Sequence, residues 1–154
     1  MTNHGTILLV ENDQNDVLLM KKAFVEEVMP SDLQVVDSYA DVVKYLSGDG
    51  VYANRVSFPM PFLMILDLKI PGEGGFAVLR WLHDRPGLRK KFIVIVLSTA
   101  ALEQEIQLAY ELGAQSFLEK PLGFKQFAQT VRRIKEYWIE LNLLPHSLVG
   151  LTAL

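Results

Sequence analysis

The chain has 154 residues, half of them apolar, with a formal net charge of -3 and no cysteine. The negative charge disfavours nucleic acid or an anionic membrane surface as a partner, and the lack of cysteine excludes disulfides and thiolate sites. No apolar stretch approaches the roughly 20 residues that span a bilayer, so we expect one cytoplasmic domain over residues 1–154.

Five short segments are predicted to be strands. Four are apolar runs and the fifth is a weaker candidate, in chain order 6–10, 33–36, 62–66, 92–97 and 116–118. The first and fourth segments are rich in Ile, Leu and Val and do not alternate with polar residues. Such runs are typical of strands that are covered on both faces, as in a parallel sheet.

Between these strands, apolar residues recur at three- and four-residue steps, which predicts five amphipathic helices. Ser38 and Asp41 are suited to cap the second helix, and Gly113 to end the fourth. The loop over 48–61 is longer than usual. Strand and helix thus alternate five times, which predicts a doubly wound α/β parallel sheet with helices on both faces. The apolar positions of the helices are Val17, Met20, Phe24 and Val28; Val42, Val43 and Leu46; Phe76, Leu79 and Leu82; Leu102, Ile106, Ala109 and Tyr110; and Phe124, Phe127, Ala128, Val131, Ile134, Trp138 and Leu141.

Polar residues collect at the ends of four predicted strands, where sites form in this architecture. Crowded acids repel one another, and an oxygen-binding cation such as Mg²⁺ relieves that repulsion. A lysine and a serine beside them would hold phosphoryl oxygens, with Asp67 as the nucleophile. Each residue alone is better explained by a helix cap, a backbone-bonded hydroxyl or a solvated charge, but together they favour a phosphoryl site. The set is Glu11, Asn12, Asp13, Asp67, Ser98, Thr99 and Lys120.

Four motifs occur in order at these strand ends: ILLVEND, MILDLKIPGEGGF, IVLSTA and FLEKPLGF. Through them the chain resembles a response-regulator receiver domain, with a core of about 6–141 and an extension over 142–154. The resemblance implies a flavodoxin-like, CheY-like sheet of order 2-1-3-4-5. It also implies that Asp67 is the phosphoacceptor, Ser98 the hydroxyl that reports on the phosphoryl group, and Lys120 the lysine of the site.

Within the family, the chain most resembles the stand-alone regulators that pair with phytochrome-type histidine kinases. This narrower resemblance rests on the long loop with Gly48, Asp49, Gly50 and Tyr52, and on the segments AYELGAQSFLEKP and EYWIELNLLP. It implies a phosphoryl group taken from a sensor histidine kinase, and a homodimer with Tyr137, Trp138, Leu141 and Leu144 at its interface. The apolar tail residues Leu148, Val149, Leu151 and Leu154 support the same expectation, because a second subunit would cover them.

The resemblance also assigns the metal ligands. Glu11 and Asn12 hold the positions of an acidic pair. Asp67 and the Lys69 backbone carbonyl would be further ligands for Mg²⁺, for which Mn²⁺ or Ca²⁺ would substitute. Asn12 departs from the family, whose second residue is usually an aspartate. Asp13 is the alternative ligand if the loop shifts.

Two residues near the fifth strand have further implied roles. Phe117 would turn inward as Ser98 moves toward the phosphoryl group, and Pro121 would follow a cis peptide bond.

No DNA-binding or enzymatic output is expected. The alternatives are a degenerate receiver that binds partners without phosphorylation, motivated by Asn12, and an aspartate phosphohydrolase or flavodoxin-like protein on a similar sheet. Lys69 and the segment ENDQND disfavour the last two, because a hydrolase needs an aspartate at position 69 and a flavodoxin a glycine-rich phosphate loop after the first strand.

Overall fold

The apolar runs form five parallel strands in the order β2-β1-β3-β4-β5, as predicted. Every residue of β1 and β3 is buried, which explains why these strands show no polar alternation. The structure, a computed structural model, describes residues 4–72, 74–99 and 102–145. The strands are β1 (Thr6–Val10), β2 (Asp32–Val36), β3 (Leu63–Leu66), β4 (Ile93–Ser98) and β5 (Ser116–Glu119).

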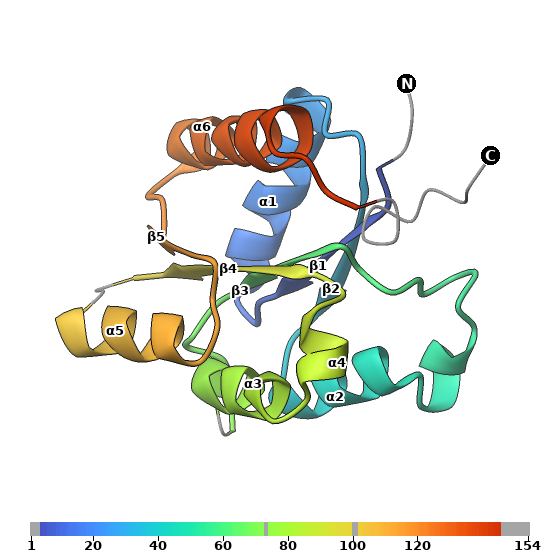
Figure 1. Ribbon diagram of the computed structural model, residues 1–154. Coiled ribbons are helices and arrows are strands. Elements are labelled where there is room, and N and C mark those ends of the chain that lie inside the picture. Colours follow the sequence, from blue (N-terminus) through green and yellow to red (C-terminus); the bar gives the residue numbers. More distant parts are fainter. Residues whose placement is uncertain (1–3, 73, 100–101, 146–154) are drawn as a thin grey trace.

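Helices cover both faces of the sheet (Figure 1). One face packs against α1 and α6, and the other against α2, α3 and α5. Two short helical turns were not predicted, a 3₁₀ turn at Gly50–Ala53 and helix α4. No helix of the described residues is long and apolar enough to cross a membrane. The helices are α1 (Gln14–Glu26), α2 (Tyr39–Ser47), α3 (Gly74–His83), α4 (Pro86–Arg89), α5 (Glu103–Glu111) and α6 (Phe124–Ile134).

The predicted helix signals are confirmed at α2 and α5. The Ser38 hydroxyl accepts a hydrogen bond from the backbone N–H of Asp41 at 3.2 Å, which caps α2. Gly113 follows α5 with a left-handed φ of 102°, a conformation that favours glycine. The long loop is held to α2 by Arg55, which donates to the carbonyls of Tyr45 and Leu46 at 2.7 and 3.0 Å.

An ion pair joins α1 to α6 across one face of the sheet. The Arg132 guanidinium donates to both carboxylate oxygens of Glu27, at 2.7 and 3.2 Å. Lys135 donates to the backbone carbonyl of Glu27 at 2.6 Å. These contacts hold the C-terminal end of α1 against α6.

The last helix differs from the prediction of one continuous helix. It is α-helical through Ile134 and continues as a wider π-helix over Lys135–Leu141. The backbone N–H of Asn142 donates to the carbonyl of Tyr137 five residues earlier, at 2.6 Å. Tyr137 and Trp138 pack edge to face within this segment, with ring centroids 4.8 Å apart. The tail beyond Pro145, with its four predicted apolar residues, lies outside the described residues.

The prediction that the apolar pattern of α1 extends to Val28 was wrong. Val28 continues the spacing of the helix, but α1 ends at Glu26 and Val28 takes a left-handed φ of 52°. The reversal lets the N–H of Met29 donate to the Phe24 carbonyl at 2.9 Å and brings Met29, not Val28, back to the core. A β-branched residue is strained in this conformation.

We therefore expect Val28→Gly to raise the free energy of unfolding by about 1 kcal/mol, because glycine adopts positive φ without the Cβ clash. The control is Val25→Gly, the same chemical change at an exposed position within α1, which should lower the free energy of unfolding by about 1 kcal/mol. Urea denaturation measures both. A loss of stability in both variants would show that the Val28 backbone carries no strain.

Candidate functional site

The hydrogen bonds of the sheet bring the polar strand-end residues to one edge. Beyond the last ladder pairs, the N–H of Glu11 donates to Val36 at 2.9 Å and that of Asp67 to Val10 at 3.1 Å. The N–H of Lys120 donates to the Ser98 carbonyl at 2.8 Å. Each functional residue is thus the first residue after its own strand, held by the neighbouring one. Because the strands are parallel, these residues share the carboxyl edge.

The Lys120 ammonium lies at the centre of this edge and contacts three carboxylates. It lies 2.8 Å from Asp67 Oδ2 and 2.7 Å from Asp16 Oδ2, and it also bonds Glu11 Oε1. The side chains of Lys120, Glu11 and Asp67 are almost fully buried. Burying charges is costly unless they are paired, so the ammonium and the acids depend on one another.

Burial and shared hydrogen bonds shift the pKa values of the two most buried acids, Glu11 and Asp67, in opposite directions. Burial, reinforced by a hydrogen bond with Asp67, raises the pKa of Glu11 from 4.5 to about 8. For Asp67, burial favours the neutral acid, but hydrogen bonds from Glu11, Lys120 and the Lys69 amide outweigh it and lower the pKa. Burial also opposes the charge on Lys120, but hydrogen bonds to the three acids raise its pKa. Of these two acids, Asp67 therefore ionises first and Glu11 keeps its proton to higher pH.

The loop after β3 fixes the Asp67 carboxylate. The backbone N–H of Lys69 donates to Asp67 Oδ1 at 2.9 Å, while Lys120 holds the other oxygen. Gly75, at the start of α3, packs directly on this loop. A Cβ there would lie 2.6 Å from Leu68 Cα and 2.7 Å from the Asp67 carbonyl oxygen. Only glycine fits without moving the loop that carries Asp67.

The polar residues that follow β1 have other contacts in the structure than the sequence predicted. Asn12 is exposed, and its backbone N–H donates to Glu11 Oε2 at 3.1 Å. Asp13 is the N-cap of α1, and its carboxylate accepts from the N–H groups of Asn15 and Asp16 at 2.8 and 3.3 Å. Its side chain is thus committed to the helix. The acid that reaches the site is Asp16, which sequence reasoning missed. The signal was present, because an N-cap at Asp13 places Asp16 in the first turn, at the helix end that faces the sheet edge.

Ser98 and Phe117 lie on the β4–β5 side of the site. Ser98 is 1% exposed, and its hydroxyl donates to the Thr99 carbonyl at 3.4 Å. Phe117 is partly buried and packs on the core that faces α2, α3 and α5. Their role as a switch pair stays a prediction.

The prediction of a cis peptide bond before Pro121 was wrong. No peptide bond of the described residues is cis, so the Lys120–Pro121 bond is trans. The trans form of an X–Pro bond is favoured by only about 0.5–1 kcal/mol in peptides, so a Lys-Pro pair in a sequence does not determine the isomer.

A scan against family models matches residues 7–132 to the response regulator receiver domain. This chain belongs to that family. The match covers both the strand ends and the helices that surround them, and it favours a receiver over the hydrolase and flavodoxin alternatives.

Individual relatives agree with this assignment. Response regulator Rcp1 of Synechocystis sp. is 30% identical over 139 residues, which are 90% of this chain and 92% of Rcp1. The crystal structure of the phosphorylated cyanobacterial phytochrome response regulator RcpA superposes with a TM-score of 0.81 at 32% identity, covering 91% of this chain and 97% of RcpA. The Mn²⁺-bound form of Rcp1 superposes with a TM-score of 0.80 at 30% identity, covering 91% and 98%.

The residues at the strand ends fit a divalent cation, which receiver domains bind. In the described part of the chain, no three acidic or histidine side chains form a ready ligand set for a metal ion. Mg²⁺, however, ordinarily takes one or two carboxylates and keeps several waters. Glu11 and Asp67, which share a hydrogen bond at the carboxyl edge, would supply these carboxylates once Glu11 has lost its proton.

The raised pKa of Glu11 predicts how stability depends on pH in metal-free protein. The folded chain binds this proton more tightly than the unfolded chain, so its stabilisation is complete below pH 4.5 and is lost as the pH rises to about 8. The loss should be on the order of a few kcal/mol. The shifts of Asp67 and Lys120 act below and above this window. Urea denaturation across the window should show the decline in the wild type.

The matched variants are Glu11→Gln and Glu103→Gln, the second at the exposed start of α5. Glu11→Gln should remove the decline and Glu103→Gln should retain it. An unchanged decline in Glu11→Gln would show that Glu11 is not the proton-binding group.

Proposed function

We propose that this chain accepts a phosphoryl group on Asp67 from a phosphohistidine of a sensor histidine kinase. The observation that carries the proposal is the ionised Asp67 carboxylate, with one oxygen held by the Lys69 amide and the other by the Lys120 ammonium. A carboxylate held in this way, at the edge where ligands reach a parallel sheet, is suited to act as a nucleophile.

In the proposed transfer, a carboxylate oxygen of Asp67 attacks the phosphorus in line with the phosphorus–nitrogen bond. That bond breaks, the imidazole leaves, and an acyl phosphate remains on Asp67. Lys120 then pairs with a phosphoryl oxygen in place of the oxygen that became esterified. Glu11, Asp67 and the Lys69 carbonyl would hold Mg²⁺, with Asn12 at the exposed side. When bound, the ion supplies charge neutralisation of the phosphoryl oxygens.

Phosphorylation would be read out by Ser98 and Phe117. Among the described residues the Ser98 hydroxyl makes a single, long hydrogen bond, at 3.4 Å, so it can turn toward a phosphoryl oxygen at small cost. Its movement would leave room for Phe117 to turn inward. The face made of α5, β5 and α6 would then shift between two arrangements and change its partner or self-association. The chain would catalyse nothing beyond its own phosphorylation and dephosphorylation.

The similarity to RcpA and Rcp1 supports a phytochrome-type kinase as the donor. A response regulator of R. palustris red light signalling, RPA3017, is similar over 92% of this chain, with a TM-score of 0.84 and 28% identity. The alternative function is a degenerate receiver that binds partners without phosphorylation. The exposed, neutral Asn12 favours that alternative, and absence of phosphate transfer from any donor would establish it.

Asp67→Asn is expected to abolish phosphate incorporation, because an amide cannot form the acyl phosphate. The control is Asp84→Asn, a well-exposed acid outside the site, which should incorporate phosphate like the wild type. Phosphate-affinity electrophoresis after incubation with a phytochrome kinase, Mg²⁺ and ATP measures both. Incorporation by Asp67→Asn at the wild-type rate would refute the assignment.

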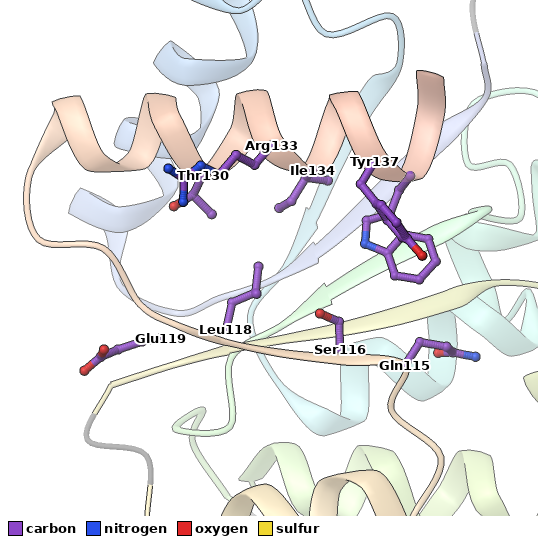
Figure 2. Close-up of a pocket in the computed structure, with 9 residues that line it drawn as sticks. Gln115, Ser116, Leu118, Glu119, Thr130, Arg133, Ile134 and Tyr137 are labelled. Carbon is purple, nitrogen blue, oxygen red and sulfur yellow. The ribbon is translucent and has the colours of Figure 1, made fainter. Parts of the chain in front are cut away.

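We also propose a homodimer through the end of α6 and the residues that follow it. Tyr137, Leu141 and Leu143 are 50%, 70% and 93% exposed, which leaves apolar surface for a partner to cover. Trp138 and Leu144 contribute less than the sequence suggested, because they pack partly on the chain's own core. A groove of about 540 Å³ between α6 and β5 adjoins this surface at Tyr137. Figure 2 shows the residues that line the groove.

Truncation after Asn142 is expected to convert the dimer into a monomer, because it removes Leu143 and the apolar tail. Sedimentation velocity at high micromolar concentration, with and without phosphorylation, measures the change. A monomeric intact chain under every condition would exclude this interface.

A further inference from the structure

Asp16 is an acid of the site to which neither the sequence motifs nor the family resemblance gave a role. It lies in the first turn of α1, and its Oδ2 is 2.7 Å from the Lys120 ammonium, as close as Asp67. Its side chain is only 24% exposed. The cap by Asp13 fixes the start of the helix, and this start directs Asp16 to the sheet edge.

Acids in the first turn of a helix have an ordinary explanation, since they stabilise the positive end of the helix dipole. That explanation requires only a carboxylate near the helix end. It does not require one that contacts the buried lysine that follows β5, a residue more than a hundred positions away. The direction of the Asp16 side chain therefore indicates a role in the site itself.

The charges of the site show what that role would be. A receiver with an aspartate at position 12 has three acids to set against one lysine and a divalent cation. In this chain position 12 is a neutral asparagine, and Asp13 is occupied by the helix cap. With Asp16 the third acid is restored, from a position four residues later.

We propose that Asp16 supplies the negative charge that Asn12 lacks, and so sets the affinity of the site for Mg²⁺. This inference rests on the proposed function. Asp16 would act on the ion through its negative charge and through its pair with the Lys120 ammonium. Without Asp16, the ammonium would be left to Glu11 and Asp67, the carboxylates that the cation needs.

The test is calorimetric titration of Mg²⁺ into the chelator-treated full chain, which requires no phosphorylation. Asp16→Asn should weaken Mg²⁺ binding by about tenfold or more, because one charge is lost close to the ion. Asp13→Asn is the matched control. It removes a charge from the same helix end but keeps the cap, because asparagine caps as well as aspartate, and should change the affinity by about twofold at most.

Asn12→Asp combined with Asp16→Asn should restore Mg²⁺ affinity to within about threefold of the wild type, which a purely structural role of Asp16 would not produce. Equal affinities of Asp16→Asn and Asp13→Asn, or no rescue by Asn12→Asp, would overturn the inference. If the wild type binds Mg²⁺ and Asp67 accepts phosphate in such a case, only the role of Asp16 is lost. If the wild type binds no Mg²⁺, this inference and the cation part of the proposed function fail together.

Discussion

The contact on which the site depends is the buried ammonium of Lys120 among the carboxylates of Glu11, Asp16 and Asp67. Without the ammonium, the acids would repel one another and take up protons, and without the acids the ammonium would be an unpaired buried charge. The arrangement also prepares the chemistry, since the charge that stabilises the resting carboxylates can later stabilise a phosphoryl group. The same buried charges therefore stabilise the resting site and serve its proposed chemistry.

The fold makes this balance possible by bringing distant residues to one edge. Glu11 follows β1, Asp67 follows β3 and Lys120 follows β5, and each is fixed by a backbone hydrogen bond to the adjacent strand. The strands themselves are held by apolar side chains on both faces, so their register cannot slip without exposing the core. The ion pair of Glu27 and Arg132 holds the C-terminal end of α1 against α6.

Much of the fold and of the site could be predicted from the sequence. Runs of apolar residues predicted the strands, and the polar residues that follow them predicted the site. The strand order and the convergence of Glu11, Asp67 and Lys120 followed from local patterns and family resemblance. Features that depend on backbone geometry could not be predicted. Val28 has the right spacing for a helix but lies beyond its end, and Asp16 looks like an ordinary helix acid until the contact with Lys120 is seen. Patterns of polarity do not record side-chain direction.

The most direct test of the central claim is a crystal structure of the chain with Mg²⁺ and beryllofluoride, a mimic of the phosphoryl group. The account predicts beryllofluoride on the Asp67 carboxylate, with the Lys120 ammonium bonded to one of its fluorines and no longer to Glu11, which should instead face the cation. A structure in which Lys120 stays on Glu11 while Asp67 remains unmodified would contradict the account.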